Sequence, residues 1–224
     1  MKKYVLLLAA LCSISLLAQQ APAPSDPKPQ ATAATAPKTY RQFNSETKDG
    51  TYTNHYFGFS YTLPSGWDSH DEETKKRVLE MGQETLKKGE QAPAQPGPEQ
   101  GFFMLLLTTP KDVLFPQVTL MAQDVVLVPQ IKTGGDFIEL LSGEFKQQPE
   151  YSLTKATEKF AIADKEFYKS EFKNGPAYQA AVFTIMRRHA VGFILTAGND
   201  NDLQDLIAGV QKMKFEPPKD AEAK

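Results

Sequence analysis

Four strand-like runs follow one another near the end of the chain, and this pattern constrains the fold more than any other feature. They cover residues 152–162, 165–173, 178–187 and 191–197, and only short turns separate them. Asn174–Gly175 is a strong signal for a tight turn because both residues tolerate positive φ. Strands joined by such short turns pair with their sequence neighbours in antiparallel fashion. We therefore expect an antiparallel meander as the framework of the domain.

Further elements surround this meander. The sequence predicts a central strand, buried on both faces, over residues 102–107 and a second long strand over 117–128. Helices are predicted over 71–88, from 136 to a point before Pro149, and over 200–213. Strands outnumber helices and are joined mostly by turns. We therefore expect the α+β class, with a single antiparallel β-sheet flanked by helices.

The first eighteen residues have the pattern of a secretory signal peptide. Lys2 and Lys3 precede an apolar run from Val5 to Leu11, and small and polar residues follow before Ala18. A positive start, an apolar segment of about 7–15 residues and a small residue at the cleavage site are typical of such peptides. The run is shorter than the roughly 20 residues that span a bilayer. We therefore expect an exported protein, periplasmic or extracellular, with no transmembrane anchor in the mature chain.

Composition divides the remainder of the chain. Residues 19–48 are predicted to be a disordered Ala/Pro-rich leader, because most of this segment lacks the apolar side chains that would offset its ordering entropy. The folded domain is predicted over 49–216, and residues 217–224 are predicted to be a disordered tail. Within the domain, residues 89–101 contain three glycines and three prolines and are predicted to form a long mobile loop.

Charge and cysteine content exclude several functions. Removing residues 1–18, which hold two lysines and no acidic residue, leaves 23 basic and 27 acidic side chains. This balance gives no electrostatic argument for binding to nucleic acid or to an anionic membrane. The single cysteine, Cys12, lies in the predicted signal peptide. The mature domain therefore has no disulfide, thiolate nucleophile or cysteine metal ligand, and its stability has to come from an apolar core.

Three short segments together resemble a known family. The segment Tyr52-Thr-Asn-His-Tyr-Phe-Gly-Phe-Ser-Tyr-Thr-Leu-Pro-Ser-Gly-Trp67 is similar to the opening of PsbP-like domains, and Asn201-Asp-Leu203 and Met213-Lys-Phe215 are similar to their end. The resemblance covers residues 51–216 and implies an α/β/α sandwich with an antiparallel sheet between helices. Plant members are extrinsic subunits of photosystem II, and a yeast relative binds a nuclear GTPase. None of their binding residues maps onto this sequence, so the resemblance implies an accessory binding module without naming its site.

Motifs that would carry catalysis are misplaced. Ser152-Leu-Thr-Lys155 matches S-x-x-K and Lys132-Thr-Gly134 matches K-T-G, a pair found in serine acyl-transfer enzymes. That chemistry needs the serine at the start of a helix, whereas Ser152 opens a predicted strand and the two motifs occur in reversed order. His55, His70 and His189 lie far apart and lack zinc-type spacing. We therefore expect no catalytic residue, no metal site, no cofactor and no enzyme activity.

Two weaker signals allow more than one interpretation. The acidic run Asp71-Glu72-Glu73 is interpreted as a helix start, where carboxylates favour the dipole, with a hard-cation site as the alternative. Gly134–Gly135 is interpreted as a turn before a helix, with an anion site at the exposed amides as the alternative.

Four residues are candidates for binding. Trp67 follows the first predicted strands and is either a core residue or a binding anchor. Arg187, Arg188 and His189 form a local basic cluster at a predicted hairpin tip. They are interpreted either as a solvated turn or as a docking contact for an acidic partner, since Arg is enriched in interface cores.

These observations together predict a non-catalytic exported module that binds a protein partner in the cell envelope and does not bind nucleic acid. One alternative is a small-ligand carrier, whose cleft would be lined by aromatic side chains of residues 52–61. Another is a hydrolase with an unrecognised site. An interaction module predicts an exposed apolar patch near residues 187–189 or 89–101, whereas a carrier predicts an enclosed apolar pocket.

Overall fold

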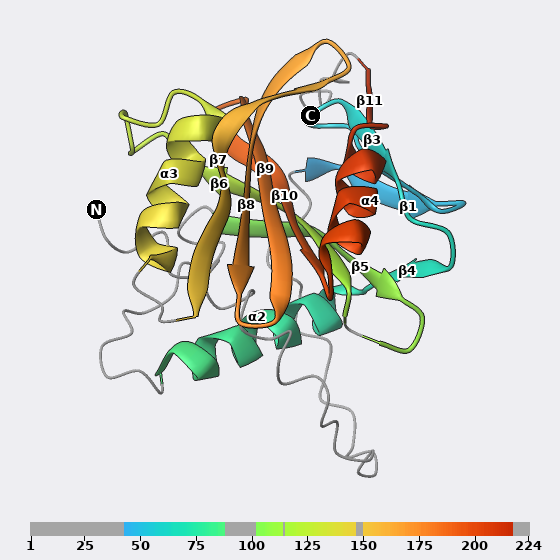
Figure 1. The fold of residues 1–224 in the computed structure, drawn as a ribbon. Helices are drawn as coiled ribbons and strands as arrows, with labels where there is room; N and C mark the ends of the chain where they lie inside the picture. The colour runs from blue at the N-terminus through green and yellow to red at the C-terminus, as the bar shows by residue number, and fades with distance from the viewer. Residues whose placement is uncertain (1–42, 88–101, 114, 147–149, 217–224) are drawn as a thin grey trace.

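The computed structural model describes residues 43–87, 102–113, 115–146 and 150–216. Within them, eleven strands form two antiparallel sheets, and three helices pack against these sheets (Figure 1). The predicted signal peptide, the whole 89–101 loop, the 217–224 tail and most of the predicted leader lie outside the described residues. Among the described helices, none has both the length and the apolar character that crossing a membrane requires.

The larger sheet has the strand order β4-β5-β6-β10-β9-β8-β7, and its neighbouring strands are antiparallel. The consecutive strands β7 to β10 pair with their sequence neighbours, which confirms the predicted meander. β5 is buried along almost its whole length, which confirms the predicted central strand. The strands are β4 (Trp67–Ser69), β5 (Phe102–Pro110), β6 (Gln117–Asp124), β7 (Tyr151–Ile162), β8 (Lys165–Asn174), β9 (Ala177–Met186) and β10 (His189–Ala197).

The smaller sheet shows that the prediction of a single sheet flanked by helices is wrong. Its strand order is β1-β2-β3-β11. The aromatic stretch forms β2 and β3, and these strands pair with β1 and β11 and bury one face on the larger sheet. β11 comes from the other end of the domain, so no local pattern indicates its pairing with β3. β1 joins β2 through the two-residue turn Asp49–Gly50, a hairpin signal that the composition of the leader obscured. The strands are β1 (Ser45–Lys48), β2 (Thr51–Asn54), β3 (Phe59–Thr62) and β11 (Lys214–Phe215).

The start of the described chain belongs to this smaller sheet. Residues 43–48 were assigned to the leader from composition, yet Ser45–Lys48 is strand β1 and pairs with β2. Phe43 is 4% exposed. Its ring stacks on Phe57 at a centroid distance of 5.3 Å. Strand pairing with β2 and one buried apolar side chain therefore dock this polar segment onto the domain.

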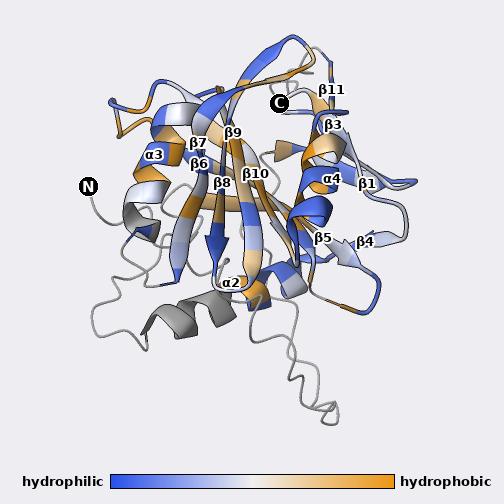
Figure 2. Ribbon diagram, in the orientation of Figure 1, coloured by the Kyte–Doolittle hydropathy of each residue, from blue (hydrophilic) through white to orange (hydrophobic). Residues whose placement is uncertain are grey.

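Helices cover both faces of the larger sheet. On one face, α3 (Gly134–Phe145) and α2 (Glu72–Lys87) bury Phe137, Ile138 and Val78 against strands of the sheet. On the other face, α4 (Asp200–Val210) and the smaller sheet share one apolar core with it. Figure 2 shows that the middle of the larger sheet is hydrophobic and the outer side of α4 hydrophilic.

α4 forms as its sequence predicts. Asn199 caps it, since its Oδ1 accepts a hydrogen bond of 2.9 Å from the backbone N–H of Asp202. Its buried stripe recurs at three- and four-residue spacing and consists of Leu203, Leu206, Ile207 and Val210.

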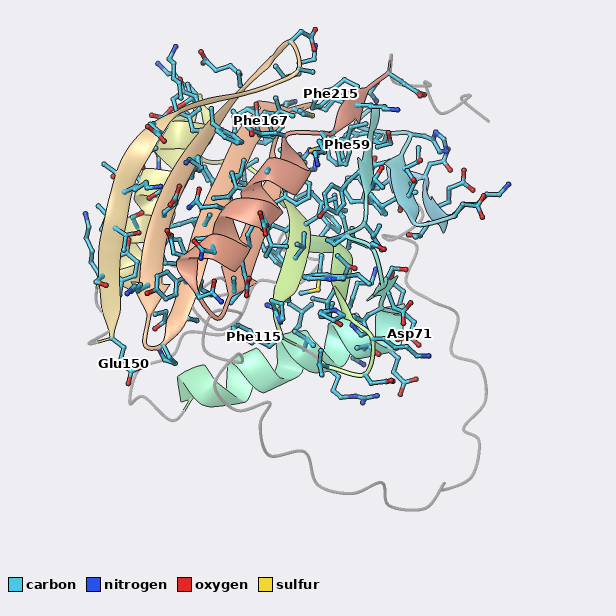
Figure 3. The ribbon with its side chains drawn as sticks, turned by 45° about the vertical axis from the view of Figure 1, so that its right-hand side comes forward. Phe59, Asp71, Phe115, Glu150, Phe167 and Phe215 are labelled. Carbon is cyan, nitrogen blue, oxygen red and sulfur yellow. The ribbon has the colours of Figure 1, made fainter. Side chains whose placement is uncertain are left out.

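Phe215 joins the two sheets near the end of the domain. Its ring lies 6.4 Å from that of Phe59 in the smaller sheet and 6.1 Å from that of Phe167 in the larger one. Figure 3 shows the three rings together between the sheets. The C-terminal strand β11 therefore closes the core that the N-terminal strands begin.

Candidate functional site

The turn between β9 and β10 carries the predicted basic cluster. Arg187 and Arg188 are its two residues, between the paired residues Met186 and His189. Both arginines have positive φ, 47° and 66°, as a type I′ turn requires. The left-handed conformation costs a residue other than glycine about 1–2 kcal/mol. Glycine or asparagine at these two positions would give a more stable turn, so the two exposed arginines cost stability.

Aromatic rings hold this turn in place. The Nδ1 of His189 donates a hydrogen bond of 2.8 Å to the backbone carbonyl of Arg187. The rings of Phe43 and Phe57 meet the imidazole edge-on at 5.8 and 5.6 Å. The guanidinium of Arg187 lies over the Tyr56 ring, 4.7 Å from its centre. The turn is therefore positioned by packing within the chain itself.

The loop between β6 and α3 presents apolar side chains beside this turn. Val126 is 40% exposed and Leu127 is 81% exposed, whereas Val125 and Ile131 are buried in the core under α3. The backbone N–H of Val125 donates a hydrogen bond of 3.0 Å to the carbonyl of Arg188, which ties the loop to the turn. Figure 2 shows a hydrophobic stretch of this loop at the edge of the molecule, next to α3.

We call the side chains of Val126, Leu127, Arg187, Arg188 and His189 the tip surface. A hollow of about 490 Å³ adjoins it and is lined in part by Arg187, Met186 and Phe57. Asp164 and Glu166, from the β7–β8 hairpin, also line this hollow. The tip surface thus combines an exposed apolar loop, two cations and a neighbouring concave area.

Trp67 lies elsewhere, at the start of β4. It pairs with Pro110 at one end of β5, whereas Phe103 near the other end of β5 lies 6.4 Å from the His189 ring. At about 3.3 Å per residue, the separation of seven positions between Phe103 and Pro110 places the two sites roughly 20 Å apart. Trp67 is half-buried and lines a separate groove beside α4. The structure therefore brings the basic cluster together and leaves Trp67 apart from it.

A buried charge cluster under α4 has no counterpart in the sequence analysis. Glu171 is 1% exposed, and its carboxylate lies 2.5 Å from the Nζ of Lys169 and 2.9 Å from that of Lys155. Gln204 of α4 donates a further hydrogen bond of 3.0 Å. Burial acts to raise the pKa of Glu171, but the hydrogen bonds outweigh it and the pKa lies below its usual value. Both carboxylate oxygens have partners, so this cluster anchors α4 to the sheet.

The structure assigns structural roles to the weaker chemical signals. Asp71 caps α2, because its Oδ1 accepts a hydrogen bond of 2.8 Å from the N–H of Thr74. Ser152 is exposed within β7, which confirms the strand that disfavoured acyl-transfer chemistry. Gly134 opens α3 against the backbone of Phe183. Across the described part of the chain, no three His, Cys, Asp or Glu side chains converge as metal ligands would.

Val126 and Leu127 are the site residues that sequence reasoning missed. The strand predicted over 117–128 was too long, since β6 ends at Asp124. After that residue the apolar run turns, and the N–H of Val128 donates a hydrogen bond of 3.0 Å to the carbonyl of Val125. The available signal was Pro129, which disfavours continuation of a paired strand.

Comparison with known proteins found a likeness of fold. No family model matches the chain, and no curated protein matches it. Among solved structures, the fold is similar to the solution structure of cyanobacterial PsbP (CyanoP) from Synechocystis sp. PCC 6803, with 13% sequence identity and a TM-score of 0.47. The match covers 84% of this chain and 100% of that chain. This is the family that the sequence motifs resemble, and the likeness concerns the fold alone.

Proposed function

We propose that this chain is an exported, non-catalytic accessory module that binds a protein partner in the cell envelope through the tip surface. Export is supported by the signal-peptide pattern of residues 1–18. The observation that carries the binding proposal is Leu127, 81% exposed on an anchored loop beside two arginines. Exposed apolar side chains next to charged ones are characteristic of protein interaction sites.

The energetics of the tip surface support this role. Full burial of a Leu or Val side chain contributes about 1.5–3 kcal/mol. Val125 and Ile131 hold the ends of the loop in the core, so little conformational entropy is lost when Val126 and Leu127 dock. The partner that fits this surface has an apolar groove flanked by carboxylates, which would pair with Arg187 and Arg188.

Site-specific photo-crosslinking tests this proposal. A photoreactive amino acid replaces Leu127 in one variant and Leu153 in a matched control, because Leu153 is 45% exposed on β7, at the far edge of the sheet. We expect a discrete protein adduct from position 127 in envelope fractions and none from position 153. Adding Arg188→Glu to the first variant removes the adduct. The same products from both positions, or no adduct from either, would contradict the proposal.

The small-ligand carrier receives less support. Its cleft was expected to be lined by the aromatic side chains of residues 52–61. In the structure, Phe57 and Tyr61 each border a surface hollow, but they are only 5% and 1% exposed and pack in the core between the two sheets with Tyr52 and Phe59. Their surface is therefore used for cohesion, and binding of a protein remains the proposal.

A further inference from the structure

A second concave site, away from the tip surface, lies between α4 and the turn that joins β3 to β4 (Figure 1). It is an open groove of about 460 Å³. Its apolar lining includes Trp67, Leu63, Pro64, Pro116 and Leu206. Open grooves lined by aromatic side chains are the surfaces on which proline-rich segments dock in their extended helical form.

The polar groups of the groove complement such a segment. Asp202 and Asp205 on the exposed face of α4 give it an acidic rim, with Lys212 nearby. Tyr61 also lines the groove and is 1% exposed. Its hydroxyl has no hydrogen-bond partner among the described residues. Because this hydroxyl is itself buried, the acidic rim supplies the polar contacts that the groove offers to a docked segment.

The chain itself contains a segment with the matching chemistry. Residues 19–42 hold five prolines, three basic residues and one acidic residue. Pro24-Ser-Asp-Pro27 has the P-x-x-P spacing of ligands that bind as polyproline helices. Lys28 follows directly, and its charge is opposite to that of the carboxylates of Asp202 and Asp205.

This segment is long enough to reach the groove in the same molecule. The described chain begins at Phe43, which stacks on Phe57. Leu63 of the groove lies six residues beyond Phe57, or roughly 20 Å along the strand at about 3.3 Å per residue. The sixteen residues from Pro27 to Phe43 span up to about 50 Å when extended. The chain between Pro27 and Phe43 is therefore longer than the distance that it has to span to the groove.

We propose that the groove between α4 and the β3–β4 turn binds the chain's own proline-rich segment around Pro24–Lys28. The prolines pack on Trp67 and Leu206, and Lys28 pairs with the acidic rim. The short tether raises the effective concentration of the segment at the groove to about the millimolar range, so a weak contact is sufficient. This site is independent of the tip surface and of any partner bound there.

Trp67 provides the test, because it is the single tryptophan of the chain. Acrylamide quenching of its fluorescence is measured in the full chain and in a variant carrying Pro24→Ala and Pro27→Ala. We expect the substitutions to raise the quenching constant about twofold, because quenching reports the fraction of open grooves. Asp205→Asn, which removes a rim carboxylate outside the first turn of α4, gives a rise in the same direction, and the melting temperature of the domain does not change.

Pro37→Ala is the matched control, since it removes a proline of the same segment outside the motif and leaves quenching unchanged. Equal quenching constants in the wild-type chain and the Pro24→Ala, Pro27→Ala variant would overturn the proposal. A difference that depends on protein concentration would also overturn it, because the segment would then come from a second copy. Neither measurement involves the tip surface, so the proposed function is tested separately.

Discussion

At the scale of single residues, two of the positions that cost stability lie in the candidate site. Arg187 and Arg188 occupy positive-φ positions of a turn that other sequences fill with Asn or Gly. Asp112, in the turn that follows β5, also has positive φ, 62°, but it lies beyond the Pro110 end of β5, opposite the end that approaches His189. Positive φ at residues other than glycine therefore occurs both inside and outside the candidate site.

This pair gives a test that separates stability from binding. Arg188→Gly should raise the free energy of unfolding by about 1 kcal/mol, because glycine adopts the left-handed conformation without steric cost. The same variant should weaken partner binding. Asp112→Gly should raise stability by a smaller amount, because Asp tolerates the left-handed conformation better than Arg, and it should leave binding unchanged. Urea unfolding and crosslinking yield measure the two effects, and unchanged binding by Arg188→Gly would contradict a role for this arginine.

Glu171 sets a pH dependence of stability. Its pKa in the folded state lies below the usual value of 4.5. Its contribution is therefore complete above about pH 5 and is lost as the pH falls through 4.5 toward the lower folded pKa. Glu171→Gln should lower the free energy of unfolding at pH 7 by about 3 kcal/mol, because it leaves Lys169 buried without its closest anion.

Urea unfolding between pH 7 and pH 3 checks this prediction. The wild-type chain should lose more stability over this range than Glu171→Gln does. Parallel pH profiles in the two proteins would show that Glu171 does not titrate with a depressed pKa. Glu158→Gln is the control, since Glu158 is 58% exposed and 3.2 Å from Lys169, and it should cost less than about 1 kcal/mol.

At the scale of elements, the helices depend on close contacts with the sheet as well as on their own sequences. α3 begins with a local device, in which Thr133 and Asp136 exchange hydrogen bonds of 3.1 and 2.8 Å. The contact of this helix with β9, by contrast, joins elements that are distant in the sequence. A Cβ on Gly134 would lie 2.0 Å from the carbonyl oxygen of Phe183, whereas one on Gly143 would meet open space.

Two substitutions in α3 distinguish these contributions. Gly134→Ala should lower the free energy of unfolding by about 3 kcal/mol, because backbone has to move to admit the methyl group. Gly143→Ala, in the same helix, should raise it by about 0.5–1 kcal/mol through helix propensity. Thermal unfolding followed by circular dichroism measures both. Similar effects of the two substitutions would show that α3 does not sit against β9 as described.

Sequence patterns predict the helices of this fold better than the ends of its strands. Apolar periodicity predicted α2 and α4 to within a few residues of Glu72–Lys87 and Asp200–Val210, because a helix satisfies its backbone hydrogen bonds locally. The same reasoning extended β6 through Val128, because composition alone does not reveal where a chain leaves its neighbour. Because of that error, the loop that carries Val126 and Leu127 was not predicted.

At the scale of the whole molecule, the two sheets share one core. Phe43, Phe57 and Phe59 from the N-terminal part pack with Phe193 and Leu203 from the C-terminal part in a single apolar cluster. Phe215 contacts rings of both sheets. We therefore expect the two sheets to unfold together.

Phe43→Ala tests this coupling. Removing a buried Phe side chain should lower the free energy of unfolding by about 3–4 kcal/mol. Urea curves from Trp67 fluorescence, which reports the β4 edge, and from far-ultraviolet circular dichroism should coincide before and after the substitution. A separate early transition in either protein would mean that the smaller sheet unfolds on its own and is not integral to the domain.

By itself the sequence determined the meander of β7 to β10, the positions of the three helices and the hairpin tip at Arg187–Arg188. Each of these depends on neighbours in the chain, through tight turns, capping and apolar periodicity. Tertiary structure alone decided that β11 pairs with β3 and completes a second sheet, that Gln204 of α4 binds Glu171, and that the loop after β6 is tied to the β9–β10 turn through Val125 and Arg188. Those contacts join residues far apart in sequence, and their energies arise from burial and pairing that only the folded chain creates.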